Sequence, residues 1–245
     1  MITAVINQKG GAGKTTFAVH LATHLVDQGR RVAFVDNDPQ GSAARWLTRG
    51  MPEIDCRTVV DARGLVPVLQ ELEEEYDDVV CDGAPRLNEQ THVLMYFADL
   101  ILIPTRPTTL DLQATIETKQ ALDKVQKARQ EDGRDPMDVH LLLNFVRTVG
   151  NLHTTVREAL RAMDYPLAAA SIGMRDAVAK AVTLQTTVQR MAAGGDKSAT
   201  KAAEEFESLW RELGISTSNH HEDRNDIGTK QHQAGKQSRR KARAA

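Results

Sequence analysis

Short apolar runs alternate along this chain with longer segments whose apolar residues recur at helical spacing. The short runs are rich in Val, Ile and Leu and show little alternation, which is typical of strands buried on both faces. Alternation of strands and helices predicts an α/β fold: a doubly wound, mostly parallel sheet with helices on both faces. The expected strands are Thr3–Asn7, Arg31–Asp36, Asp78–Asp82, Leu100–Pro104 and Val139–Phe145.

The helical segments each present one apolar face. The first helix should cover Thr15–Gln28 and end at Gly29, because glycine readily takes the left-handed conformation that closes a helix. Its apolar face consists of Phe17, Ala18, Leu21, Ala22, Leu25 and Val26. Similar patterns predict helices at Leu110–Glu131, Leu152–Met163 and Lys197–Leu213.

The composition changes sharply after Gly214. Residues 216–245 hold seven Lys and Arg against three Asp and Glu, and their apolar residues are Ile227 and a few alanines. Too little apolar surface is present there to bury a core. We therefore expect one folded domain over residues 1–215 and a basic, disordered tail over 216–245.

Charge and cysteine content narrow the class of protein. The net charge is −2, so a tail of +4 leaves the preceding body at −6. A basic tail on an acidic body suits a polyanionic partner, and it equally suits a solvated end. Cys56 and Cys81 are the two cysteines, which favours a reducing cytoplasm. No apolar stretch approaches the roughly 20 residues that span a bilayer, and the first expected strand leaves no room for a signal peptide.

The segment Asn7–Thr16 reads Asn-Gln-Lys-Gly-Gly-Ala-Gly-Lys-Thr-Thr and joins a predicted strand to a predicted helix. That context is the one expected of a phosphate-binding loop. Its glycines let several backbone N–H groups point at one anion, and the helix dipole adds positive potential. Lys14 should reach the β- and γ-phosphates, and the Thr15 hydroxyl should bind Mg²⁺. The expected phosphate cradle is Gly10, Gly11, Ala12, Gly13, Lys14, Thr15 and Thr16.

Aspartates end two of the predicted strands. Asp36 ends the second strand and is followed by Asp38, and Asp82 ends the third. The carboxyl ends of parallel strands face the ligand crevice of a doubly wound sheet, and Mg²⁺ prefers such oxygen ligands. One aspartate could simply cap the next helix. Three of them after a phosphate loop together predict a site for a nucleotide with Mg²⁺.

The loop departs from the strict G-x-x-x-x-G-K-[ST] pattern, because Gln8 stands at the first glycine position and a second lysine, Lys9, follows it. This sequence resembles the deviant Walker A motif of the ParA/MinD family of P-loop NTPases. The segments that begin at Asp36 (Asp-Asn-Asp-Pro-Gln), Asp82 (Asp-Gly-Ala-Pro) and Ile103 (Ile-Pro-Thr-Arg-Pro-Thr-Thr-Leu-Asp-Leu-Gln) resemble ParA-type partition ATPases. The resemblance covers roughly residues 1–213 and is strongest to small ParA proteins without an N-terminal helix-turn-helix.

The resemblance implies an ATPase with ATP and Mg²⁺ as its cofactors. Lys9 would reach across a dimer to the partner's phosphates, and Asp38 would orient the attacking water. Asp36 and Asp82 would hold Mg²⁺ through water, with Thr15 as a direct ligand. Asn144 resembles the asparagine that reads the adenine edge in relatives, although asparagine at a strand end is also a common turn residue.

The resemblance also implies partners. ParA-type proteins form ATP-dependent homodimers that bind DNA without sequence preference, and a separate ParB-like or cargo adaptor protein stimulates them. Phosphate contacts of this kind are sensitive to salt. The expected location is cytoplasmic and nucleoid-associated, and the expected role is to partition or position plasmid or chromosomal DNA. The candidate DNA-binding residues are Arg175, Lys180 and Arg190, which would also suit ordinary exposed positions on a helix.

Three alternatives share the same phosphate loop. One keeps the ATPase mechanism but positions a protein cargo or a conjugation complex. A MinD-like septum regulator would need a membrane-binding apolar face in its tail, which residues 216–245 lack. The third is a small-molecule ligase or a nitrogenase-type reductase; the reductase needs cluster-ligating cysteines. Cys81 in a strand and Cys56 in an expected loop do not suit that role.

Overall fold

The computed structural model describes residues 1–147 and 152–215. Met1–Leu213 forms one compact unit. The tail at 216–245, expected to be disordered, lies outside the described residues, so the division into a domain over 1–215 and a tail stays a prediction.

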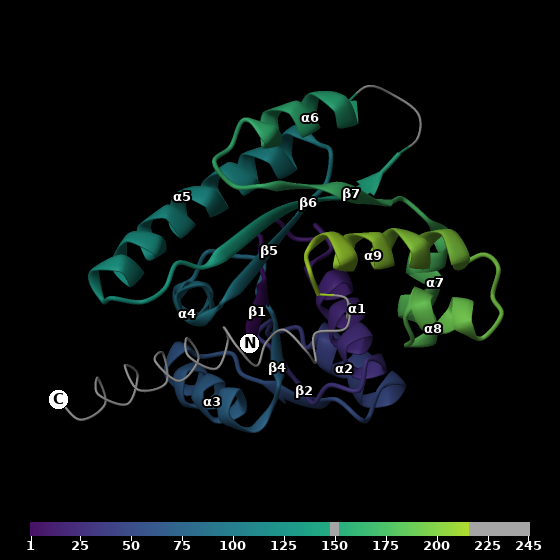
Figure 1. The fold of residues 1–245 in the computed structure, drawn as a ribbon, viewed down its shortest axis with the longest axis horizontal. Helices are drawn as coiled ribbons and strands as arrows, with labels where there is room; N and C mark the ends of the chain where they lie inside the picture. Colours follow the sequence, from purple (N-terminus) through teal and green to yellow (C-terminus); the bar gives the residue numbers. More distant parts are fainter. Residues whose placement is uncertain (148–151, 216–245) are drawn as a thin grey trace, which may run out of the picture. The chain divides into compact units, whose positions relative to one another are not determined.

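A seven-stranded sheet forms the centre of this unit (Figure 1). Its strand order is β3-β2-β4-β1-β5-β6-β7, and every pair of neighbours is parallel. The expected doubly wound parallel sheet is therefore confirmed. The strands are β1 (Ile2–Val5), β2 (Val32–Asp36), β3 (Asp55–Thr58), β4 (Asp78–Asp82), β5 (Leu100–Thr105), β6 (Asp138–Val146) and β7 (Leu167–Gly173).

Helices cover both faces of the sheet (Figure 1). One layer packs its apolar side chains on β1, β4, β5 and β6 and comprises α3 (Ala62–Glu75), α4 (Glu89–Phe97), α5 (Thr109–Glu131) and α6 (Leu152–Arg161). In the other layer, α1 packs on the central strands and α9 packs on β7. That layer comprises α1 (Lys14–Asp27), α2 (Ser42–Gly50), α7 (Asp176–Leu184), α8 (Val188–Ala193) and α9 (Thr200–Glu212).

Burial on both faces explains why the central strands read as continuous apolar runs. Every residue of β1, β2, β4 and β5 is buried. Side chains of Ile2 and Ala4 join the core beneath α3–α6, and the alternate residues serve the other layer. Gly29 has a φ of 79° directly after the last cap residue of α1, so its expected role in ending that helix is confirmed.

The two edge strands, β3 and β7, were not predicted, because neither reads as a continuous run of large apolar residues. β3 reads Asp-Cys-Arg-Thr and is only half-buried, so Cys56 lies in a strand and not in the expected loop. β7 is built largely from small residues. Its outer backbone amides are covered by α9, because the Glu212 carboxylate accepts from the amides of Ala169 (2.6 Å) and Ala170 (2.9 Å). Such cover keeps an edge strand from pairing with another chain.

Within residues 1–147 and 152–215, no helix combines the length and the apolar character that crossing a membrane requires.

Candidate nucleotide-binding site

The phosphate loop lies at the carboxyl edge of the sheet, where β1 is flanked by β4 and β5. Chain connections run to one side of β1 through β2 and β4 and to the other side through β5, so β1 marks the switch point of this sheet. The parallel register places Asp82 directly between Val5 of β1 and Asp36 of β2. Both strand-ending aspartates therefore lie beside the loop that follows β1.

The backbone of the loop depends on glycine. Gly11 and Gly13 have φ values of 74° and 105°, in the left-handed region that side chains disfavour. A Cβ on Gly13 would lie 2.0 Å from Asn144 Nδ2. Position 13 therefore accepts only glycine on two independent grounds.

The amino end of α1 carries no capping side chain. Gly13 is its N-cap, its first turn holds no acidic residue, and among the described residues no side chain accepts from its first amides. By contrast, Asp61, Asn88 and Thr108 cap α3, α4 and α5 with side-chain oxygens. The N–H groups and the dipole at this end of α1 would suit an anion at the carboxyl ends of the strands.

Lys14 is the first residue of α1 and is 6% exposed. Its ammonium group donates to the carbonyl oxygen of Lys9 at 3.2 Å. Burial lowers the pKa of Lys14, and the nearby carboxylates of Asp82 and Asp38 oppose that shift. The Lys9 side chain is half-buried and forms no ion pair with any residue that the structure describes.

Thr15 and Asp82 meet across the crevice. The Thr15 hydroxyl donates to Asp82 Oδ2 at 2.6 Å, while Asp82 Oδ1 is buried and has no hydrogen-bond partner within the described chain. Burial raises the pKa of Asp82 to about 7, against the hydrogen bond from Thr15. A buried carboxylate oxygen without a partner beside a threonine hydroxyl fits hydrated Mg²⁺ as a ligand.

Asp36 and Asp38 shape the turn after β2. Asp36 accepts from the backbone amides of Asp38 (3.1 Å) and Ala44 (2.8 Å), and burial raises its pKa. Asp38 is half-buried and accepts from the Gln40 amide at 2.9 Å. The structure thus brings both aspartates to the same edge as Lys14 and Asp82, and their catalytic and metal-binding roles stay predictions.

Asn144 holds the loop from β6. Its side chain is buried, donates to the carbonyl oxygen of Ala12 at 2.8 Å and accepts from the Phe145 amide at 2.9 Å. The recognition of adenine by Asn144 stays a prediction, since the contact that the structure gives is to the phosphate loop.

Sequence reasoning missed two supports of the loop. The side chain of Asn7 is buried, accepts from the Lys9 amide (3.0 Å) and donates to the Pro104 carbonyl (2.9 Å). Arg106 makes a bidentate pair with buried Asp111 (2.9 and 3.1 Å) and lies close to Gly11. Asn7 could have been recognised in the sequence as a polar residue at the end of a buried strand. The pairing of Arg106 with Asp111 is visible only in the folded structure.

The three candidate DNA-binding residues are each neutralised within the chain. Arg175 pairs with Glu205 (2.5 Å), and Lys180 pairs with Asp196 (2.6 Å). Arg190 contacts two acids, Asp27 and Glu53, each at 2.7 Å. Their role in DNA binding stays a prediction that now requires the exchange of a carboxylate for a phosphate.

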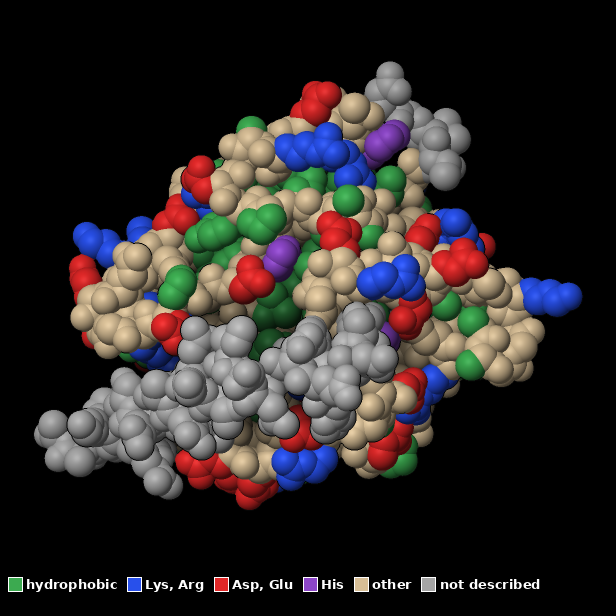
Figure 2. Space-filling view, in the orientation of Figure 1, with side chains coloured by type: hydrophobic (Ala, Val, Ile, Leu, Met, Phe, Trp, Pro, Cys, Tyr) green, Lys and Arg blue, Asp and Glu red, His purple; other side chains and the backbone are tan. Residues whose placement is uncertain are grey.

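Two arginines on α6 differ from those three. Neither Arg157 nor Arg161 forms an ion pair within the part of the chain that the structure describes. Burial and the neighbouring charge of Arg161 lower the pKa of Arg157, and the charge of Glu212 opposes that shift. Figure 2 shows Lys and Arg side chains gathered beside a His over α6. α6 also carries exposed Glu158, so it is weakly basic, and its two arginines have no ion-pair partner to release among the described residues.

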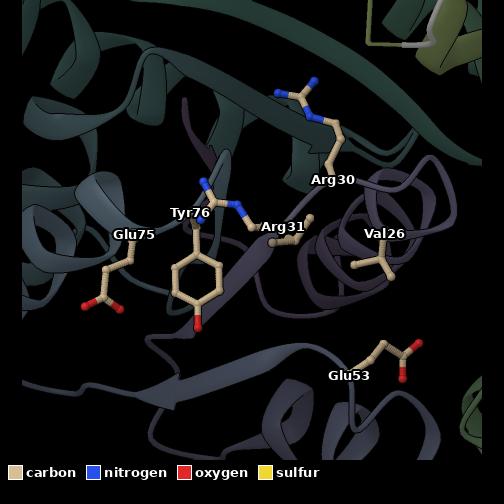
Figure 3. Close-up of a pocket in the computed structure, with 7 residues that line it drawn as sticks. Val26, Arg30, Arg31, Glu53, Glu75 and Tyr76 are labelled. Atoms are coloured by element: carbon tan, nitrogen blue, oxygen red, sulfur yellow. The ribbon is translucent and has the colours of Figure 1, made fainter.

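A hollow of about 430 Å³ lies at the opposite edge of the sheet (Figure 3). Most of its lining lies at or just before the amino ends of β2, β3 and β4, whereas ligands of doubly wound sheets bind at the carboxyl ends of strands. Several of its charges are already paired, such as Arg31 with Asp77 (2.9 Å) and Glu53 with Arg190. It is lined by Val26, Arg30, Arg31, Val32, Glu53, Glu75 and Tyr76.

Comparison with known families agrees with this geometry. Residues 3–188 match the family described as the CobQ/CobB/MinD/ParA nucleotide binding domain. The chain belongs to this family, and its fold is that of the P-loop NTPases in the ParA/MinD group.

Individual relatives extend the comparison. The chain is 30% identical to the maintenance of carboxysome distribution protein A of Halothiobacillus neapolitanus, over 86% of this chain and 94% of that protein. It superposes on a substituted variant of Cyanothece McdA in complex with ATP with a TM-score of 0.66 at 16% identity, covering 89% of this chain and 97% of that one. It also superposes on the septum site-determining protein MinD of Pyrococcus horikoshii with Mg-ADP. The TM-score is 0.67 at 19% identity, and the match covers 86% of this chain and 95% of that one. The two structural likenesses show the fold alone.

Replacing Thr15 by Val should selectively weaken the binding of nucleotide with Mg²⁺. The change removes the hydroxyl that contacts Asp82 and would bind the cation. A hydrogen bond to a charged group contributes about 1.5–3 kcal/mol, so affinity for MgATP should fall by about ten- to a hundredfold. Calorimetric titration with MgATP, and with ATP plus EDTA, separates the two binding modes. Thr15→Ser should behave like the unmodified protein, and equal losses with and without Mg²⁺ would contradict this role.

Proposed function

We propose that this protein is an ATPase that uses ATP with Mg²⁺. The observation that carries the proposal is the uncapped amino end of α1 beside buried Lys14 and the Asp82 oxygen that has no partner in the described chain. The free amides and Lys14 would hold the phosphates, Thr15 would bind Mg²⁺ directly, and Asp36 and Asp82 would hold its water ligands. The relatives crystallised with ATP and with Mg-ADP support this choice of cofactors.

The same site supports a dimeric mechanism. Bound Mg²⁺ would neutralise phosphate charge, and Asp38, half-buried at the crevice, would orient the attacking water. Lys9 has no ion-pair partner in the described chain, so its charge is available to the phosphates of a second subunit. Supplied in trans, such a charge acts as an arginine finger does. ATP binding would therefore assemble the dimer, and hydrolysis would release it.

The cargo is most simply a large protein assembly. A relative that matches this chain over nearly its whole length maintains the distribution of carboxysomes, which are protein assemblies. We infer that the ATP dimer binds DNA non-specifically, in the cytoplasm and on the nucleoid, and that an adaptor on the cargo stimulates hydrolysis. The partition of plasmid or chromosomal DNA by a ParB-like adaptor is the second candidate, because the matched family includes ParA.

Lys9→Ala should abolish ATP-dependent dimers while leaving nucleotide binding within about threefold of normal. The variant keeps Lys14 to bind the phosphates of its own nucleotide, so only the interaction of Lys9 with the phosphates of the second subunit is lost. Light scattering with and without ATP, together with phosphate release, measures dimers and turnover. Lys127→Ala on α5, where Lys127 is 78% exposed, is the control for loss of a surface lysine. Normal dimers in the Lys9 variant would refute the role in trans.

DNA binding by the ATP dimer should depend more on Arg157 and Arg161 than on Arg175. Neither arginine of α6 forms an ion pair with a described residue, although the charge of Glu212 acts on Arg157, whereas Arg175 must leave Glu205. Removing one arginine–phosphate interaction should flatten the log–log salt slope by about 0.9. Mobility shifts across a salt series would compare Arg157→Gln and Arg161→Gln with Arg175→Gln and with deletion of residues 216–245. Loss of binding in the Arg175 variant alone would restore the interface expected from the sequence.

In the cell, Asp38→Ala should leave the protein bound to ATP and disturb the placement of a protein assembly. Loss of a water-positioning group typically reduces turnover by about 10²–10⁴-fold, so the adaptor could no longer release the ATPase. Fluorescence imaging of protein assemblies and of plasmid and chromosome loci in one strain distinguishes the two cargoes. Misplaced DNA loci with normally distributed protein assemblies would favour the partition of DNA instead.

A further inference from the structure

His20 of α1 uses both of its ring nitrogens to connect segments that are far apart in the sequence. Nδ1 lies 2.8 Å from the carbonyl oxygen of Thr16, which is four residues earlier in the first turn of α1, where the phosphate loop runs into the helix. On the other side, the Val188 amide donates to Nε2 at 3.3 Å. The side chain is fully buried, so water does not compete for either contact.

These contacts fix the protonation state of the ring. Because a backbone amide donates to Nε2, that nitrogen is the acceptor, and Nδ1 carries the proton that goes to Thr16. Burial lowers the pKa of His20 to about 4, with the Thr16 carbonyl opposing the shift. The imidazole is therefore neutral near pH 7 and offers one donor and one acceptor in a fixed orientation.

The ring is also held tightly between aromatic neighbours. Phe206 of α9 stacks on it, with centroids 4.4 Å apart and planes at 10°. Trp46 of α2 meets it edge-on at 5.8 Å and 85°. Close packing on both sides leaves the imidazole little freedom to move separately from its two hydrogen-bond partners.

The segment at the far end of this link has its own contacts to α2. Trp46 Nε1 donates to the Thr186 carbonyl at 3.1 Å, and the Gln185 carbonyl lies where a Cβ on Gly50 would be. Val188 is the first residue of α8, whose Arg190 contacts Asp27 and Glu53. A displacement at Val188 would reach both α2 and the ion pairs of α8.

We propose that His20 is a positioning residue that couples the state of the phosphate loop to residues 185–190. A nucleotide that draws the loop amides toward its phosphates moves the Thr16 backbone, and the imidazole carries that movement to the Val188 amide and to Trp46. This inference rests on the proposed binding of ATP, and it adds a defined route from the phosphates to the C-terminal helices. The route uses no charge, so salt does not weaken it.

The two tryptophans of the chain provide the readout, since Trp46 and Trp210 are its only ones. Trp210→Phe leaves Trp46 as the single reporter, in contact with His20 and bonded to Thr186. In this background, MgATP should change the intensity or wavelength of tryptophan emission. ADP and EDTA-treated ATP serve as comparisons, and calorimetry measures nucleotide binding separately.

His20→Phe in the same background keeps the stacked ring and removes both hydrogen bonds. The emission change should fall by at least half, while nucleotide affinity stays within about threefold. His20→Gln, which restores one donor and one acceptor, should recover part of the change. Thr23→Val is the matched control, because Thr23 is also buried on α1 and bonds to the carbonyl four residues earlier, but its second contact is to Met51 and not to residues 185–190. An undiminished emission change in His20→Phe would overturn the proposal.

Hydrogen exchange keeps the proposal testable if His20→Phe does not fold. In the unmodified protein, MgATP should slow or accelerate amide exchange in a peptide that spans residues 185–190 by at least threefold. Unchanged exchange there, with nucleotide binding demonstrated by calorimetry, would overturn the coupling and leave the ATPase proposal intact. Absence of nucleotide binding itself would instead refute the proposed function.

Discussion

The uncapped amino end of α1 is the constraint around which the rest of the site is built. Free amides there would be costly in a dry interior, so the site must remain open to an anion. Close by, burial lowers the pKa of Lys14 and raises that of Asp82. Phosphate and Mg²⁺ would each relieve one of these desolvated charges. Binding of such a ligand would therefore stabilise the folded chain by linkage.

The parallel sheet supplies the geometry that this arrangement needs. Its register sets Asp36 and Asp82 on adjacent strands beside the loop after β1. The strand order makes β1 the switch point of the sheet, and Asn144 reaches the loop from β6 on the other side. These positions follow from backbone pairing, so the site is fixed by the most buried part of the fold.

Sequence patterns were sufficient to predict those parts of the molecule whose structure has one dominant physical cause. Buried central strands read as apolar runs, and the loop Gly10–Thr16 was recognisable from its glycines between a strand and a helix. The edge strand β3 is too polar for that pattern, and α3 contains Pro67 inside its span, which argues locally against a helix. Tertiary packing determines the conformation of both β3 and α3, and tertiary packing cannot be read from the pattern of a single sequence.

The charged residues of the C-terminal helices are a second case in which the sequence alone does not show the tertiary contacts. Arg175, Lys180 and Arg190 stand in a sequence that suits a basic surface, but their acidic partners come from other elements. The pair between Arg190 and Asp27 joins residues 163 positions apart. Only the fold reveals that such a cation is already paired. Distances between charges, and not their count, therefore decide which arginines can meet a polyanion at low cost.

The loop is held at both ends by different layers of the molecule. At the start of the loop, the Asn7 side chain bonds to Thr115 of α5 (3.3 Å), and the Gln8 amide donates to the Thr118 hydroxyl of the same helix (3.4 Å). At its end, the loop continues into α1, where His20 contacts the Thr16 carbonyl. A phosphate that reshapes the loop therefore pulls on both faces of the sheet at once. Because packed interiors shift between discrete arrangements, a small movement at the phosphates can be felt on distant helices. An ATPase that must change partners on hydrolysis needs that kind of connection.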